Sequence, residues 1–364
     1  MLPVVAIRAL AAERAVRWFP ELAGARHEVD VRLLATRPRC TLYDVRLTGP
    51  AAARRVVVKY RTDLPSSPAT DRPTLVPGRV PPMQQAALEY AGLRHVEAGL
   101  DPTDRRFGAV RALDLLGDCP VLVLEHVNAP TLRQVLLSRS RLGVGDRRLR
   151  RTDSAAHRNA GAWLAHFHRT AGPLATDERV GGRDELLEHV AAFGDYLVDA
   201  GTTGVKDIVR RSAATVAALL PARLPLMVSH GDFAPRNVFV DPDGRVSVFD
   251  PMPRWRAPLL EDVCRYLVGV RLLGLQVHSH GTAFSSGALD QVEDDFLAGY
   301  FGGAVPTEQV TAFRLVVLLD KWSALMSAGP RSGPRAIAAG ARQRWVTGYV
   351  RREAVRLLRQ AESA

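Results

Sequence analysis

Cysteine and long apolar runs are scarce in this 364-residue chain. Its three cysteines, Cys40, Cys119 and Cys264, are widely spaced, with no CxxC pair and no histidine at ligand spacing. Neither a disulfide framework nor a zinc site is therefore indicated. We expect buried, unreactive thiols in a protein of a reducing, cytoplasmic compartment.

Uncharged apolar segments long enough to cross a bilayer are also missing, so we expect no transmembrane segment. Near the N-terminus, Arg8, Glu13 and Arg14 interrupt what would have to be the apolar core of a signal peptide. With 47% hydrophobic and 24% charged residues, the composition is that of a soluble globular protein of one large or two smaller domains.

Lysine is rare as well: Lys59, Lys206 and Lys321 stand among 49 basic residues, so a lysine at a motif position carries extra weight. The net charge of +11 fits nucleic acid, an anionic membrane surface or an anionic substrate as a partner. Because no recognisable nucleic-acid-binding module and no interleaved aromatic residues accompany the arginines, we expect no nucleic-acid partner.

Hydrophobic periodicity divides the chain into a strand-rich first third and a mostly helical remainder. The pattern before residue 128 predicts strands over 27–35, 40–49 and 54–61, a proline-rich link over 63–82, one helix over 83–100 and two further strands within 107–127. From residue 131 onward helical periodicity dominates, and short strands interrupt it near residue 240.

The stretch HGDFAPRNVFVDPDGRVSVFD begins with a cluster of polar residues and ends on Asp250. Its DPDG turn predicts a strand, a reversal and a strand, which would bring Asn237 close to Asp250. A carboxylate at Asp232 can accept a hydroxyl proton, and Asn237 and Asp250 offer hard oxygen ligands to magnesium. A surface hairpin with capping polar residues is the alternative interpretation.

The spacing of His230, Asp232, Asn237 and Asp250 resembles that of the aminoglycoside phosphotransferase and choline kinase-like family. FDP in place of DFG fits the small-molecule branch of protein kinase-like proteins. The resemblance implies an ATP- and Mg²⁺-dependent phosphotransferase, with GTP as the alternative nucleotide, acting on a small-molecule hydroxyl.

The fold class that this resemblance implies is α+β and bilobal. A small antiparallel-sheet lobe with one helix would occupy residues 1–124 and bind the nucleotide. A hinge would span 125–130, and a larger, mostly helical lobe over 131–364 would carry catalysis and the acceptor site.

Site residues in the catalytic segment follow from the same resemblance. Asp232 becomes the catalytic base, and Asn237 and Asp250 become the metal ligands. His230 and Asp262 become structural support of the catalytic loop, although a favourable charge at a helix N-terminus explains Asp262 equally well.

Nucleotide-binding residues follow in the same way. Lys59 stands in the third strand, where the family places the lysine that contacts the α- and β-phosphates, and a solvated strand lysine is the alternative. Glu89 resembles its helical glutamate partner, with Glu97 as another candidate. The segment LVLEHVNAPTL resembles the hinge, where the carbonyl of Glu125 and the amide of Val127 would bind adenine.

One departure from the family pattern concerns the phosphates. No glycine occurs between Gly24 and Gly49, so the usual glycine-rich turn is absent and the choice between ATP and GTP stays open. Arg37 and Arg39 could contribute charge in its place, or could simply be solvated.

The acceptor is expected beyond Asp250, where Arg254, Trp255 and Arg256 suit a sugar or an anionic group, or else anchor the loop. From Arg254 to the end, 14 basic and 10 acidic residues leave a charge of +4, which disfavours a polycationic aminoglycoside. The acidic cluster at 293–295 could still form a local cationic site.

We therefore expect the acceptor to be a sugar or glycoside hydroxyl. An antibiotic phosphotransferase of the aminoglycoside type and a non-catalytic pseudokinase are the alternatives. Six arginines between 139 and 151 are read as a solvated insertion, with a peripheral contact to anionic lipid or glycan as the alternative.

Overall fold

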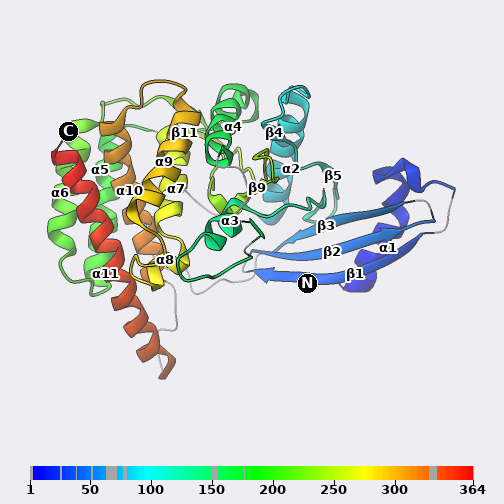
Figure 1. Cartoon of the computed structure of the whole chain (residues 1–364), viewed down its shortest axis with the longest axis horizontal. Helices are drawn as coiled ribbons and strands as arrows, with labels where there is room; N and C mark the ends of the chain where they lie inside the picture. The colour runs from blue at the N-terminus through cyan, green and yellow to red at the C-terminus, as the bar shows by residue number, and fades with distance from the viewer. Residues whose placement is uncertain are drawn as a thin grey trace.

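Two lobes make up the molecule, a β-sheet lobe at one end and a helical lobe at the other (Figure 1). The structure is a computed structural model, and it describes residues 3–24, 27–37, 39–50, 52–62, 72–76, 80–146, 148–149, 155–175, 177–179, 181–327 and 334–363. Most of the proline-rich link, together with Arg147, Arg150 and Arg151 of the arginine-rich insertion, lies outside these residues.

The N-terminal sheet is antiparallel, with the strand order β1-β2-β3-β6-β5. Its strands are β1 (Glu28–Arg37), β2 (Cys40–Thr48), β3 (Ala53–Arg61), β5 (Ala112–Leu115) and β6 (Val121–Glu125). Because successive side chains of a strand point to opposite faces, Val56 and Val58 of β3 enter one apolar cluster. Val57 packs into another on the opposite face, where Lys59 contacts the following helix.

Two helices flank this sheet, whereas the sequence pattern predicted one. The predicted helix is α2 (Pro82–Gly99), which packs against β3, β5 and β6. The additional helix, α1 (Val4–Trp18), covers the face that carries Val56 and Val58. Two of its four buried residues are alanines, Ala11 and Ala15, so its hydrophobic period was weak.

A second sheet contains the predicted hairpin that precedes Asp250, with the order β4-β10-β9. It is formed by β4 (Phe107–Gly108), β9 (Val238–Val240) and β10 (Val246–Val248). The run over 107–127 thus holds three strands rather than the predicted two, and the first of them pairs with the C-terminal lobe. Since β4 pairs in parallel with β10, its two residues gave no hairpin signal in the sequence.

The C-terminal lobe consists mainly of helices around one large apolar core. Its helices are α3 (Leu132–Ser138), α4 (Ala156–Thr170), α5 (Arg183–Asp199), α6 (Val205–Leu219), α7 (Leu260–Arg271), α8 (Gly274–His278), α9 (Ser286–Phe301), α10 (Thr307–Ser327) and α11 (Pro334–Glu362). A small third sheet combines β7 (Asp177–Glu178), β11 (Trp255–Pro258) and β8 (Leu226–Val228). Among the described residues, no helix is long and apolar enough to span a membrane.

Close helix packing in this lobe depends on glycine. A Cβ atom at Gly161 of α4 would lie 2.0 Å from the carbonyl oxygen of Phe296 in α9. A Cβ atom at Gly299 of α9 would lie 1.9 Å from the carbonyl oxygen of Arg158. Any larger side chain at either position would force the two helices apart.

The three cysteines are free thiols, as the sequence predicted. Cys40 and Cys264 are buried, and Cys119 is partly buried. Burial raises the pKa of the Cys119 thiol, with a smaller contribution from the charge of Asp118, so this thiol is not activated.

Candidate active site

Asp262, in the first turn of α7, holds the backbone of the HGD segment in place. Its carboxylate accepts hydrogen bonds from the amides of His230 (2.6 Å) and Gly231 (3.1 Å) and from the hydroxyl of Ser229 (3.1 Å). His168 contacts the same carboxylate through Nε2 at 3.2 Å. Gly231 has a φ of +83°, a conformation that residues with a Cβ rarely adopt.

The pKa of Asp262 is lowered. Burial alone would raise it, but the hydrogen bond and charge of His168, followed by the contributions of His230, outweigh burial. Asp262 therefore presents an ionised acceptor to buried backbone donors, which is a strong form of hydrogen bond.

His230 is fully buried in an aromatic setting. The centroids of Phe233, Phe167 and Trp163 lie 5.3, 5.9 and 6.1 Å from its ring centroid. Burial lowers the pKa of His230, so the ring is neutral at physiological pH. The imidazole of His230 therefore packs among aromatic rings, and the residue is held in place through its backbone amide, which donates to Asp262.

Asp232 and Asn237 lie at the two ends of the same short loop. The side-chain nitrogen of Asn237 donates to the backbone oxygen of Asp232 at 2.8 Å and to its carboxylate at 3.1 Å. Because the amide nitrogen is turned toward Asp232, the amide oxygen of Asn237 is the atom presented to other ligands. Nη2 of Arg236 contacts both carboxylate oxygens of Asp232, at 2.5 and 2.6 Å.

The β9–β10 hairpin brings Asn237 next to Asp250. The amide of Phe249 donates to the carbonyl of Asn237 at 3.0 Å, so the two candidate metal ligands stand on adjacent strand ends. Asp250 has a φ of +63°, a left-handed conformation that is uncommon outside glycine and that often marks functional positions.

The pair suits magnesium, which is usually held by one or two protein oxygen ligands together with substrate phosphates and water. No cluster of three or more His, Cys, Asp or Glu side chains able to hold a metal occurs among the residues that the structure describes. The donor set of Asn237 and Asp250 therefore fits a metal bound jointly with a phosphate ligand rather than a self-sufficient metal centre.

Lys59 reaches from β3 toward both α2 and the hairpin. Its Nζ lies 2.8 Å from the carboxylate of Glu89 and 2.9 Å from that of Asp250. Glu97, the other candidate partner, contacts Arg94 and Arg111 near the surface, so the alternative pairing is wrong. Glu89 is fully buried, as an ion pair at the base of the site requires.

Charges in this cluster are mutually stabilised. Burial would lower the pKa of Lys59, but the carboxylates of Asp250 and Glu89 outweigh burial and raise it. Burial would raise the pKa of Asp250, but Lys59 and Arg61 outweigh burial and hold it well below the usual range. Both groups are therefore ionised at physiological pH.

The segment predicted as the hinge follows directly after β6, which ends at Glu125. Val127 packs into a partly buried apolar cluster with Phe239 and Phe249, whose rings stack with centroids 4.6 Å apart. Val57 of β3 lies in the same cluster. Partly buried apolar side chains of β3, of the segment predicted as the hinge and of the β9–β10 hairpin thus pack against one buried apolar cluster.

The three residues expected at the acceptor site, Arg254, Trp255 and Arg256, have different surroundings. The amide of Met252 donates to the carbonyl of His230 at 2.9 Å, which brings the segment leading to Arg254 beside the catalytic loop. The Trp255 ring is 7% exposed, with the Arg254 guanidinium 4.8 Å from its centroid. Arg256 donates to the carbonyl of Gly172 at 3.4 Å. This burial favours the loop-anchoring interpretation of Trp255.

Comparisons with known proteins agree with this geometry. A sequence profile of the phosphotransferase enzyme family (APH) matches residues 74–267, slightly more than half of the chain. The chain belongs to this family. The predicted small-molecule phosphotransferase is thereby confirmed at the level of the family, although Lys59 lies outside the matched segment.

Solved structures share the fold of this phosphotransferase. Spectinomycin phosphotransferase APH(9)-Ia, solved with ADP and spectinomycin, has a TM-score of 0.54 at 10% identity and covers 100% of this chain and 99% of its own. Amicoumacin kinase hAmiN, solved with AMP-PNP, Ca²⁺ and Ami, has a TM-score of 0.52 at 12% identity, covering 96% and 95%.

A glucosamine kinase has a TM-score of 0.50 at 16% identity, covering 96% of this chain and 87% of its own. These likenesses confirm the predicted bilobal, protein kinase-like fold. A comparison with curated protein sequences gives no match.

Two charged residues of α10, Asp320 and Lys321, were not recognised from sequence as part of the surroundings of Asp232. Asp320 of α10 is 3% exposed and accepts a hydrogen bond from Arg72 at 3.0 Å. Its neighbour Lys321 has a pKa lowered to about 8 by burial and by the charge of Arg265, while Asp232 and Asp320 oppose that shift. The rarity of lysine was the available signal for Lys321, but nothing in the sequence indicated that its charge and that of Asp232 influence each other.

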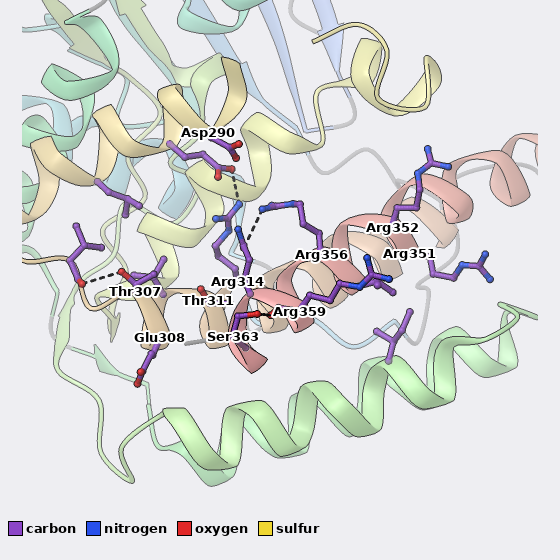
Figure 2. Close-up of a pocket in the computed structure, with 18 of the residues that line it drawn as sticks. Asp290, Thr307, Glu308, Thr311, Arg314, Arg351, Arg352, Arg356, Arg359 and Ser363 are labelled. Carbon is purple, nitrogen blue, oxygen red and sulfur yellow. Dashed lines mark hydrogen bonds and ion pairs between the residues drawn. The ribbon is translucent and has the colours of Figure 1, made fainter. Parts of the chain in front are cut away.

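A cavity of about 1270 Å³ lies elsewhere, between α6, α9, α10 and α11 (Figure 2). None of the predicted site residues lines it. It holds Glu293 and Asp294 of the acidic cluster, and Glu293 is bound by Arg271 and Arg314. Asp295 lies 3.5 Å from Arg158. Two of the three residues of the acidic cluster are thus paired with arginines, so the cluster does not offer an open binding site for a cationic ligand.

Proposed function

We propose that this phosphotransferase transfers the terminal phosphoryl group of ATP to a hydroxyl of a small molecule, with Mg²⁺ as the metal and a sugar or glycoside as the acceptor. The observation that carries the proposal is the convergence of Lys59, Asp232, Asn237 and Asp250. These residues come from β3, the catalytic loop and the far end of a hairpin, and a chain without this chemistry has no need to gather them.

Asp232 is the proposed catalytic base. In the reaction, the acceptor oxygen forms a bond to the terminal phosphorus of ATP, the bond from that phosphorus to the ADP oxygen breaks, and the hydroxyl proton passes to Asp232. A hydrogen bond from Asn237 orients the carboxylate for this step. His230 and Asp262 support the loop from behind without touching the substrates.

Asn237 and Asp250 are the proposed metal ligands, through an amide oxygen and a carboxylate. A bound magnesium ion would neutralise phosphate charge and orient the terminal phosphoryl group. Lys59, held by Glu89, is the proposed contact to the α- and β-phosphates. The solved relatives named above contain ADP in one case and AMP-PNP with Ca²⁺ in another, which supports the use of a nucleotide and a divalent ion.

The base of the nucleotide is proposed to lie on the apolar surface formed by Val57, Val127, Phe239 and Phe249. A purine ring gains affinity there through apolar contact and stacking. The backbone carbonyl of Glu125 and the amide of Val127 remain the proposed hydrogen-bonding partners of adenine. On this basis we divide the chain into a nucleotide-binding lobe over 1–124, a hinge over 125–130 and an acceptor-binding lobe over 131–364.

A sugar or glycoside is the preferred acceptor because cationic groups lie near the carboxylate of Asp232. Arg236 contacts Asp232 directly, and Lys321 is close enough for the two charges to influence each other. Arg254 lies in the segment that runs beside the catalytic loop, so it is a further acceptor candidate. A polycationic aminoglycoside would be repelled here, whereas a neutral or acidic sugar would not.

Two alternatives remain part of the proposal. An antibiotic phosphotransferase is supported by the spectinomycin and amicoumacin enzymes among the structures of the same fold. A non-catalytic pseudokinase would follow from the missing glycine-rich turn, but the complete set of chemical groups argues against it.

The test is to measure ATP and GTP consumption with Mg²⁺ against a panel of sugars, amino sugars, aminoglycosides and amino alcohols. Asp232→Asn is expected to lower turnover of the best acceptor by about 10²- to 10⁴-fold, the usual contribution of a positioned base. Asp243→Asn, in the exposed DPDG turn, is the matched control and should leave turnover unchanged. Full activity of the Asp232 variant would refute the assignment.

A further inference from the structure

Arg61 shares the charge cluster of Lys59, although the pattern of the family gives it no role. The two residues are two positions apart on β3, so their side chains project from the same face of the strand. Arg61 is 7% exposed, and its Nη2 donates to Asp250 Oδ1 at 2.7 Å and also to Glu89. Because Lys59 contacts the same oxygen of Asp250, the two cationic groups are immediate neighbours.

The β1–β2 turn lies directly beside Arg61. Cys40, the first residue of β2, is paired with Arg61 across the sheet, and the amide of Thr62 donates to the carbonyl of Arg39 at 3.1 Å. In the sequence, a proline and an arginine stand between the last residue of β1 and the first residue of β2. Proline has no N–H group, so one of these two positions cannot donate an amide hydrogen bond to a phosphate.

We propose that Arg61 is a second phosphate-binding cation of the nucleotide site, acting beside Lys59 in place of the amides of a glycine-rich turn. This inference rests on the proposed function. A guanidinium carries five N–H donors in a planar fork that matches phosphate oxygens in pairs, which a lysine cannot do. The arrangement therefore supplies paired and directed donors next to the single ammonium group of Lys59.

The charges of the cluster support this role. Lys59 and Arg61 balance Glu89 and Asp250, so the four groups are neutral together. A metal ion on Asp250 would compete with both cations for that carboxylate. Arg61 would then keep its ion pair with Glu89, and the N–H groups released from Asp250 would be available to a phosphate. In its present position its Nε is buried and has no hydrogen-bond partner among the described residues, so the guanidinium is incompletely satisfied.

The competing explanation is that Arg61 only holds Glu89 and Asp250 in place. The two roles differ in what they predict for ligands with and without phosphates. A phosphate-binding cation contributes to the affinity of ADP and contributes nothing to that of adenosine. A purely structural residue affects both ligands alike, since it acts through the shape of the site.

The experiment is calorimetric titration of the full chain with ADP plus Mg²⁺ and with adenosine. Arg61→Met keeps the length of the side chain and removes its charge. We expect the Kd for ADP to rise about 10- to 100-fold, as loss of a charge-assisted hydrogen bond implies, and the Kd for adenosine to stay within about twofold. Arg61→Lys keeps one charge without the fork and should give an intermediate loss for ADP alone.

The outcomes separate the inference from the proposed function. If Arg61→Met weakens the binding of ADP and of adenosine equally, or changes neither affinity, the proposed role of Arg61 is wrong. Binding of both ligands by the wild type would still support the proposed nucleotide site. A wild-type chain that binds neither ligand overturns both. Should Arg61→Met fail to fold, Arg61→Lys decides alone, because ADP affinity equal to that of the wild type would contradict a requirement for the paired guanidinium donors.

A second readout uses the metal without nucleotide. Mn²⁺ binding followed by electron paramagnetic resonance should be tighter in Arg61→Met than in the wild type, because Arg61 no longer competes for Asp250. Weaker Mn²⁺ binding in that variant would contradict the proposed release of Arg61 from Asp250.

Discussion

The backbone amide of His230 donates to the carboxylate of Asp262 across 32 positions of sequence, at 2.6 Å. This bond ties the start of the catalytic loop to the first turn of α7. Because α7 packs in the apolar core, it holds the start of this loop in a fixed position. The backbone of the HGD segment therefore depends on the carboxylate of Asp262 for its position.

Asp262→Asn is expected to lower the free energy of unfolding by about 2–3 kcal/mol, because the amide cannot accept every buried donor that the carboxylate accepts. Turnover should fall at least about tenfold through displacement of the loop, while the affinity for nucleotide changes little. Urea unfolding and steady-state kinetics measure the two effects. Asp195→Asn, at an exposed position on α5, is the control, and an equal effect of both variants would contradict the bracing role.

Gly92 of α2 packs against the segment that follows Asp250. A Cβ atom there would lie 3.0 Å from Pro251 and 3.2 Å from Pro253. Gly92→Ala should therefore displace α2 or the FDP segment and lower turnover, at a net stability cost of about 1 kcal/mol despite better helix propensity. Gly99→Ala in the same helix meets no atom within 4 Å and should not lower turnover. Unimpaired kinetics in Gly92→Ala would show that the contact is not needed.

Lys321 gives a prediction for pH dependence. Its pKa in the folded protein is lowered to about 8 from 10.5, so the folded state loses this proton first as the pH rises. Between pH 8 and pH 10.5, unfolding is accompanied by the uptake of a proton by Lys321. The free energy that the folded protein loses by burying a charged Lys321 is therefore fully present below pH 8, and it disappears as the pH rises toward 10.5.

Lys321→Met should therefore stabilise the protein at pH 7, by up to about 3 kcal/mol, with a gain that shrinks as the pH rises to 10. Urea unfolding of variant and wild type at pH 7 and pH 10 measures this difference. Lys206→Met, at an exposed position, should show no such trend. A gain that grows with pH would mean that the direction of the shift is wrong.

Leu75 belongs to the link between β3 and α2, yet it is 1% exposed and lies in the core of the C-terminal lobe. Leu75→Ala should cost about 3 kcal/mol of unfolding free energy, the usual cost of truncating a buried leucine. Leu142→Ala, whose side chain is exposed, should cost less than about 0.5 kcal/mol. A negligible effect of Leu75→Ala, measured by urea unfolding, would show that the link is not anchored there.

Much of the fold was predictable because its signals are local. Alternation marked β1, β2 and β3, and helical periodicity marked α2 and the longer helices of the C-terminal lobe. The helix α1 was not predicted because alanines occupy two of its four buried positions, which weakens its hydrophobic period. The strand β4 escaped because its two residues pair with a partner 139 positions away in sequence, which no turn announces.

The sequence by itself determined the chemistry of the catalytic segment. The spacing from Asp232 to Asn237 and the DPDG turn before Asp250 are properties of one short stretch, so the placement of its carboxylates and amide follows from local geometry. Lys59 was identified because lysine is rare in this chain and because the family resemblance places a phosphate-binding lysine in the third strand.

Tertiary structure alone decided how these parts combine. It paired Lys59 with Glu89 instead of Glu97, and it joined Arg61 to Asp250. It also brought Lys321 close enough to Asp232 for the two charges to influence each other. Each of these relationships joins segments that are distant in sequence, and their distances depend on how the two lobes pack. Packing of that kind results from burial summed over many residues, which no single motif encodes.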